Sequence, residues 1–169
     1  MNTAKLLVEA YGRLRPLVHG AAEGLGEDEL VFRVDGEANS IAWLIWHLSR
    51  VQDHHLAQAA AREQIWTSSE WPERFGLPAQ SELTGYGDSA DQVALVRAES
   101  AELLTGYYDA VHERTIEYLG SLSDTDLDRV VDTSYDPPVT LGVRLVSVLG
   151  DDLQHIGQAA FIRGITERR

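Results

Sequence analysis

The sequence predicts an all-α protein, a four-helix bundle with long connections between its helices. Four segments carry apolar residues at a spacing of three and four, which is typical of amphipathic helices. The stretches between them hold prolines and glycines that interrupt regular structure. A chain of 169 residues has the length of one domain, so we assign residues 1–169 to a single bundle domain.

Each helix is placed by its apolar stripe and by the residues that begin or end it. Thr3 can cap the first helix, Asn39-Ser40 is a good N-cap for the second, and Thr140 begins the last. Pro16 is expected to kink or stop the first helix. We expect the four long helices at about residues 3–19, 40–64, 89–119 and 140–164. Short helical turns are expected at 27–31 and 123–126, and an extended or irregular segment at 130–138.

The segment 66–90 lacks periodicity but contains three large apolar side chains, Trp66, Trp71 and Phe75. Loops of this length are uncommon within a compact domain and are often functional. We therefore expect the segment to cover one end of the bundle.

Composition excludes several classes of partner. The 27 acidic and 14 basic residues give a net charge of −13 without a basic patch, which argues against binding to nucleic acid or to an anionic membrane. No apolar run is long enough for a membrane span, and the first residues do not resemble a signal peptide. The absence of cysteine excludes thiolate ligands and a cysteine nucleophile. We expect a soluble, cytoplasmic protein.

The last helix carries a candidate metal site. Asp151 and His155 are four residues apart, so their side chains lie on one helix face, and that face is part of an apolar stripe. A buried ionic group is costly unless it is paired or bound to a metal. His47, on the core-facing side of the second helix, is the expected third ligand. Two imidazoles and one carboxylate suit zinc, nickel, iron(II) or manganese(II), with coordination positions left open. Asp152 and His54 are weaker alternative ligands.

Other readings of the same residues remain open. Asp151 and His155 could form only an ion pair within one helix. Arg50 could contact a site carboxylate or a substrate anion, or form a surface salt bridge. Gln158 is expected to bond backbone near the site.

The remaining histidines and glycines of interest have simpler expected roles. We expect His54 and His55 at the surface or its boundary, and His19 and His112 in solvent. Three glycines of the last helix indicate close approach of a neighbouring helix, in the bundle or in a dimer: Gly142, Gly150 and Gly157.

Two runs of residues resemble a known family. His-Leu-Ser-Arg-Val-Gln-Asp at 47–53 is similar to a run on the second helix of the DinB-like superfamily, and Asp-Asp-Leu-Gln-His-Ile-Gly-Gln at 151–158 is similar to its fourth-helix run. That superfamily includes YfiT-like metal hydrolases and the mycothiol-dependent maleylpyruvate isomerase. The run Trp-Leu-Ile-Trp-His at 43–47 is similar to an uncharacterised actinobacterial branch.

The resemblance implies a four-helix bundle, a metal site formed by His47, Asp151 and His155, and a homodimer. Asp151 stands where the family usually has His or Glu, and its shorter side chain reaches less far. The isomerase has a second domain for which this chain has no room, so its substrate is not carried over.

We expect a metal-dependent enzyme that acts on a small-molecule substrate. The resemblance implies transfer or isomerisation with a low-molecular-weight thiol of the mycothiol type, the ion lowering the pKa of the thiol. Hydrolysis of a small substrate is the alternative. A stress-related dimeric protein that binds metal or ligand without catalysis is a third hypothesis.

Overall fold

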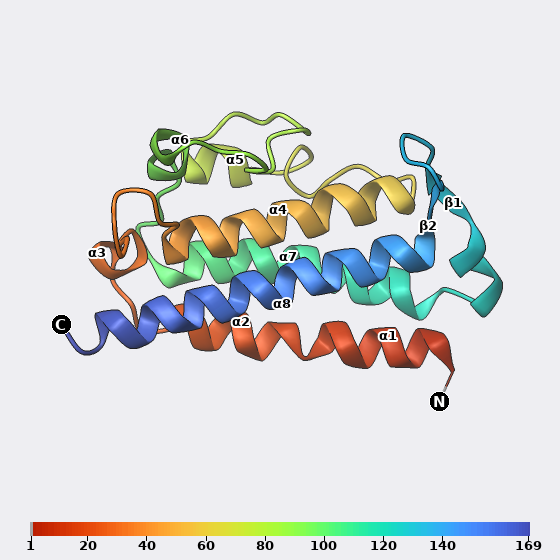
Figure 1. The fold of residues 1–169 in the computed structure, drawn as a ribbon, viewed down its shortest axis with the longest axis horizontal. Coiled ribbons are helices and arrows are strands. Elements are labelled where there is room, and N and C mark those ends of the chain that lie inside the picture. The colour runs from red at the N-terminus through yellow and green to blue at the C-terminus, as the bar shows by residue number, and fades with distance from the viewer. Residues whose placement is uncertain (1) are drawn as a thin grey trace.

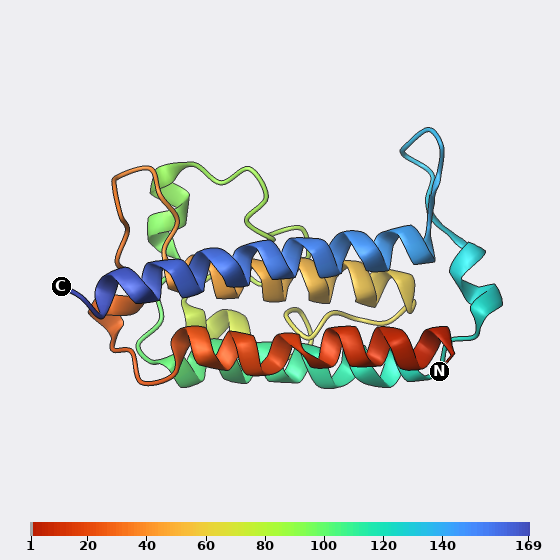
Figure 2. The same cartoon turned by 60° about the horizontal axis from the view of Figure 1, so that its bottom comes forward.

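The structure, a computed structural model, describes residues 2–169 and confirms the predicted all-α architecture. Four rods of helix lie side by side (Figure 1). The first rod consists of α1 and α2, and each rod packs mainly against two others: α4 packs against α7 and α8, and the first rod packs against the same pair (Figures 1 and 2). The rods are α1 (Thr3–Gly12) with α2 (Leu14–Ala22), α4 (Ile41–Ala59), α7 (Ala101–Gly120) and α8 (Leu141–Thr166).

The first rod is broken at Arg13 and continues beyond the predicted end to Ala22. Pro16 explains the break, because it has no N–H for the carbonyl of Gly12 and its ring crowds that carbonyl. Pro16 therefore kinks the rod rather than ending it. The N-cap is Asn2 instead of Thr3: its side-chain oxygen accepts the Lys5 backbone N–H at 3.0 Å.

Helix α4 begins as predicted but ends at Ala59, before the expected end near residue 64. Ser40 caps its N-terminus by accepting the Trp43 N–H at 3.1 Å. At the other end Ala61 has a φ of 52°, which turns the chain away from the helix axis. The reversal allows the backbone N–H groups of Ile65 and Trp66 to donate to the Asp53 carboxylate, both at 2.8 Å.

The expected long third helix is in fact two helices. The short α6 (Ala90–Leu95) is separated from α7 by residues 96–100, in which Val96 is extended. Neither glycine nor proline marks this interruption. Instead the linker buries Val96 and Ala98, and Ser100 forms an antiparallel bridge with Gly26. Tertiary packing therefore overrides the helical spacing here.

The connections contain short elements. The expected turns are present as α3 (Glu27–Leu30) and the 3₁₀ helix η1 (Asp124–Asp128). Segment 130–138 contributes to a small antiparallel hairpin of β1 (Val130–Asp132) and β2 (Val139–Thr140). Segment 66–90 includes α5 (Trp71–Phe75) and lies along the outer side of α4, not over an end of the bundle (Figure 1).

The glycines of α8 do not mark close helix packing within the chain. A Cβ at Gly150 or Gly157 would meet no described residue within 4 Å. A Cβ at Gly142 would lie 3.4 Å from the carbonyl oxygen of Leu127 in η1. Among residues 2–169, no helix combines the length and the apolar character needed to cross a membrane.

Candidate metal centre

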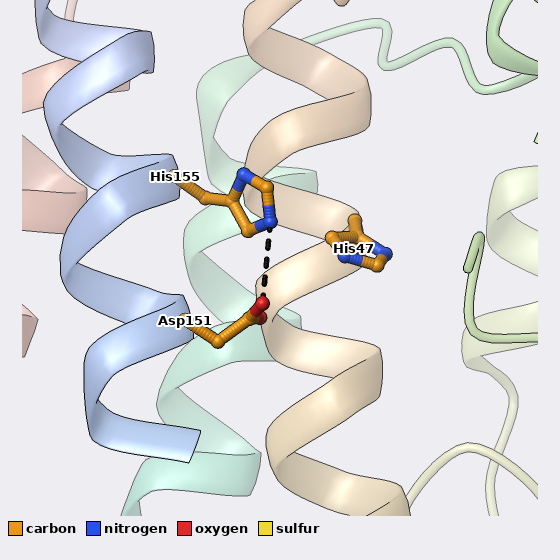
Figure 3. Close-up of side chains that lie close together, drawn as sticks. All are labelled: His47, Asp151 and His155. Carbon is orange, nitrogen blue, oxygen red and sulfur yellow. Dashed lines mark ion pairs between the residues drawn. The ribbon is translucent and has the colours of Figure 1, made fainter. Parts of the chain in front are cut away.

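Helices α4 and α8 bring His47, Asp151 and His155 together (Figure 3). Each of these residues offers a ligand atom, and all three atoms lie within 4.8 Å of one another. The imidazole centroids of His47 and His155 are 4.8 Å apart, with the rings nearly perpendicular. The predicted ligand set is therefore present as a spatial cluster, formed by two helices that pack directly against each other.

Hydrogen bonds prepare both histidines to offer Nε2. The Nδ1 atom of His47 lies against the Thr84 carbonyl, and Nδ1 of His155 lies 3.0 Å from Oε1 of Gln158. Since a carbonyl oxygen can only accept, each Nδ1 carries a proton, and Nε2 is the nitrogen that has a lone pair when the ring is neutral. Such partners on the other ring nitrogen are usual for metal-ligating histidines. Gln158 therefore bonds the side chain of a candidate ligand, His155, whereas we expected it to bond backbone.

Asp151 has one carboxylate oxygen that no protein group satisfies. Its Oδ1 lies 3.5 Å from Nε2 of His155, an ion-pair distance, while Oδ2 is buried and has no hydrogen-bond partner among residues 2–169. Buried polar atoms are rarely left unpaired, because they lose their bonds to water. A cation between the three side chains would satisfy this oxygen and the two Nε2 lone pairs. The donor set therefore fits a divalent metal.

The surroundings of the cluster also shift the pKa values of Asp151, His155 and His47. Burial raises the pKa of Asp151, but the hydrogen bond and charge of His155 outweigh it, so the pKa lies below its usual value. For His155, burial lowers the pKa, and the bonds to Asp151 and Gln158 together raise it above its usual value. Burial keeps the pKa of His47 below its usual value. A metal therefore meets more competition from a proton at His155 than at His47.

The loop around Gly85 holds His47 in place, through a contact that the sequence analysis did not predict. A Cβ at Gly85, whose φ is +86°, would lie 2.9 Å from Nδ1 of His47 and 2.9 Å from the Trp46 ring. On the other side, the Trp43 ring stacks on His47 with centroids 4.4 Å apart and an interplanar angle of 10°. Trp43 is itself fixed by its Nε1–H, which donates to Asp88 at 3.0 Å.

A cleft of about 390 Å³ adjoins the cluster, and His47 and Asp151 form part of its wall. His54 and His55 line it from α4, and Arg144 lines it from α8. Loop side chains complete the wall, among them Tyr86 and Tyr135. Two of the three candidate ligands can therefore be reached by a small molecule.

The two alternative ligands lie outside the cluster. Asp152 points into the core, is fully buried, and neither of its carboxylate oxygens has a partner among the described residues. Burial, with the nearby charge of Asp151, raises its pKa well above the usual value and so favours its protonated form. His54 lies in the same cleft, with Nδ1 3.2 Å from the Ser81 carbonyl and Nε2 3.9 Å from Glu82.

Arg50 is fully buried, so the expectation of a surface salt bridge was wrong. Its guanidinium donates to Asp53 and Tyr107 in the core. The remaining bonds reach the 64–83 segment, and with them all three guanidinium nitrogens have partners: Leu83 O, Gln64 Oε1 and Ser81 O. Arg50 thus anchors that segment to α4 and has no contact with the cleft.

Two further histidines differ from their expected place in solvent. His112 is buried and its ring stacks on Tyr108, with centroids 5.5 Å apart. His19 is partly exposed and pairs with Asp109 at 3.0 Å, next to Arg15. Neither belongs to the metal-type cluster.

Comparison with known proteins agrees with this arrangement. The chain is 27% identical to a conserved protein from Enterococcus faecalis of known crystal structure, with a TM-score of 0.91 over 100% of this chain and 99% of that one. A search of curated proteins found no match. The sequence profile of the DinB superfamily matches residues 10–159, which is most of the chain. With a bundle of matching shape and a profile match of this extent, the chain belongs to the DinB superfamily.

Proposed function

We propose that this protein is a metal-dependent enzyme that holds one divalent cation at His47, Asp151 and His155. The observation that carries the proposal is the position of this candidate ligand set beside a cleft of substrate size, with His47 and Asp151 in the wall of the cleft. Structural metal sites are closed by four protein ligands, whereas catalytic zinc sites have three and keep a position open. Three ligand side chains beside a cleft match the second pattern.

The chain's own residues bind and orient. Thr84 and Gln158 fix the histidine tautomers, and Trp43 with Gly85 limits the movement of the His47 ring. A divalent ion held by these ligands would supply Lewis acidity and lower the pKa of a water or thiol bound to it.

For the reaction, we propose transfer or isomerisation with a low-molecular-weight thiol of the mycothiol type. The absence of cysteine supports this, because a sulfur nucleophile must then come from outside the chain. Hydrolysis of a small substrate is the alternative, and the same cleft and ligand set support it. An assay of thiol consumption beside an assay of ester or amide hydrolysis, both with the metal-loaded protein, separates the two.

Elemental analysis of protein purified without a His-tag or chelator tests the site. We expect close to one divalent ion per chain in the wild type, and strong loss in His47→Ala, Asp151→Ala and His155→Ala with little loss of fold. His54→Ala is the matched control, since His54 lines the cleft but lies outside the ligand cluster. Equal metal content in all four variants would refute the ligand set.

Thermal unfolding gives a second readout. Metal that binds only the folded state adds about 2.7 kcal/mol of stability at 100 times its dissociation constant. Added zinc, nickel or manganese should therefore raise the melting temperature of the wild type and of His54→Ala. The three ligand variants should show little of this increase.

A further inference from the structure

The outward face of α8 carries a strip of surface without charge. The solvent-facing sides of helices ordinarily carry charged residues, and on α7 the exposed side chains include Glu102, Glu113 and Glu117. Between residues 143 and 161 of α8, all of which the structure describes, no charged side chain is exposed. A long strip of this kind indicates a surface of interaction. Its exposed large apolar side chains are Val143 (58%), Val146 (67%), Leu153 (46%) and Phe161 (67%).

These residues follow the spacing of a coiled-coil seam. Six positions on the outer side of α8 alternate in steps of three and four, as the a and d positions of a heptad repeat do, and all six are apolar. The buried stripe of α8 is a separate set, which includes Leu145, Val148 and Ile156. A second apolar seam therefore runs along the outside of the helix over roughly 26 Å. The six residues, which we call the α8 seam, are Val143, Val146, Gly150, Leu153, Gly157 and Ala160.

The two glycines of the seam leave room for a neighbouring helix. A Cβ at Gly150 or Gly157 would meet no described residue within 4 Å. Gly157 also lines a hollow of about 570 Å³, together with Val34 and Phe161. Glycine within a helix lowers the stability of that helix. A helix of another molecule, packed closely against the seam, accounts for glycine at both positions.

The order of large and small residues along the seam is self-complementary. In an antiparallel pair of identical helices, a twofold axis between Gly150 and Leu153 forms layers that each combine one large and one small side chain. A second copy of this chain therefore supplies the surface that the seam requires. The layers are Val143 with Ala160, Val146 with Gly157, and Leu153 with Gly150 of the second copy.

The charges at the two ends of α8 favour the same arrangement. The helix begins beside η1 and the β1–β2 hairpin, where Asp124, Asp128 and Asp136 are exposed (Figure 1). At its other end, Arg168 and Arg169 are exposed. An antiparallel pair places each acidic end near the basic end of the second copy, whereas a parallel pair would place like charges together. The uncharged seam also lets two chains approach although each has a net charge of −13.

We propose that two copies of this chain associate through the α8 seam, as an antiparallel helix pair with a twofold axis between Gly150 and Leu153. This pairing uses a different side of α8 from the cleft beside the ligand cluster, so it does not depend on the proposed metal-dependent function. The residues that α8 contributes to that cleft are Arg144, Ser147, Val148 and Asp151.

Sedimentation equilibrium of the full chain over a range of concentrations tests the proposal. The wild type should form a dimer of twice 18.7 kDa, with and without metal. Gly157→Leu should raise the dissociation constant of the dimer on the order of 100-fold, because the new side chain overpacks the layer with Val146 twice in each dimer. The fold should stay intact, since the position is open within the chain and leucine favours a helix more than glycine does.

Gly157→Leu combined with Val146→Ala tests the register of the pair. The exchange restores a layer of one large and one small residue, so the dissociation constant should return to within about tenfold of the wild-type value. The two positions are roughly 16 Å apart along one helix, so they can compensate only between copies. Gly120→Leu is the matched control and should remain dimeric. Gly120 is also an open helical position, but it lies on α7, which packs mainly against other rods than α8.

A monomeric wild type would overturn the proposal and leave the seam to a partner of another kind. A dimer that Gly157→Leu does not weaken would overturn it as well, because the contact would then use another surface. A double variant that stays monomeric would show that Val146 and Gly157 do not face each other, which also overturns the pairing. Metal content, measured in the same preparations, keeps the two proposals separate: a dimeric wild type that takes up no metal would refute only the metal-dependent function.

Discussion

Helix α4 contributes to two polar clusters that lie about one turn apart. One is built on Arg50 and Asp53 and the other on His47, and they differ in how far the protein satisfies their hydrogen bonds. Arg50 and Asp53 are both buried, and their bonds to Tyr107, Gln64 and the 64–83 backbone occupy all three guanidinium nitrogens and both carboxylate oxygens. His47 faces α8, where Asp151 retains an oxygen that has no partner among residues 2–169. The polar atoms of Arg50 and Asp53 are thus all hydrogen-bonded within the protein, whereas those of the His47 cluster are not.

The difference separates a structural cluster from a candidate binding site. A buried polar network is tolerated when each member is satisfied, and it then fixes a unique packing. In the cluster of His47, Asp151 and His155, by contrast, three potential ligand atoms lie close together beside a cleft. Polarity alone does not distinguish the two groups, since both combine a carboxylate with basic side chains.

The largest effect that we expect is from Arg50→Leu. This change leaves Asp53 buried without its cationic partner, and breaking a buried pair in this way costs about 3–5 kcal/mol. Urea unfolding of metal-free protein measures the loss. His47→Leu is the comparison on the same helix and should cost clearly less without metal. Similar losses in the two variants would remove the distinction between the saturated and the unsaturated group.

The candidate ligand cluster could be predicted from the sequence because the patterns that indicate it are local. Asp151 and His155 share a face by helix spacing alone, and His47 lies near an apolar stripe on another helix. The choice between Asp151 and Asp152 was less determined, because both lie within reach of His155 along the helix. Packing decides it: α8 turns Asp152 into the core and Asp151 toward α4.

Features that depend on irregular segments could not be predicted. The burial of Arg50 depends on residues 64–83, whose course has no periodic pattern. The early end of α4 depends on Asp53 accepting two backbone N–H groups from the same segment. The interruption before α7 likewise depends on burial of Val96, which a helical stripe accommodates equally well. These are long-range contacts, and propensity does not encode them.

Gly85→Ala tests whether the loop positions His47. A non-glycine residue at this positive φ costs about 1–2 kcal/mol, and the new Cβ would also displace the imidazole. We expect metal affinity to fall by about 10- to 100-fold, the usual effect of losing a partner behind a ligand. Affinity is measured by competition with a chromogenic chelator.

Gly87→Ala is the matched control for that experiment. Its φ is +78°, so it shares the backbone cost, but a Cβ there meets no described residue within 4 Å. The two variants should lose similar backbone stability, while metal affinity falls clearly only in Gly85→Ala. An equal fall in both would mean that the loop's conformation matters and its contact with His47 does not.

The smallest expected effect concerns His55, which faces the cleft but is not a ligand. Its pKa is lowered from 6.5 to about 4, by burial and then by the charge of Arg144. Between these two values the unfolded chain binds a proton that the folded protein does not, so stability falls as pH decreases from about 6.5 to 4. His55→Gln should make this fall shallower in metal-stripped protein, measured as melting temperature against pH. Arg144→Gln should give an intermediate slope, because it removes only the second cause. A slope unchanged by either substitution would place the acid sensitivity elsewhere in the molecule and remove His55 from the electrostatics of the cleft.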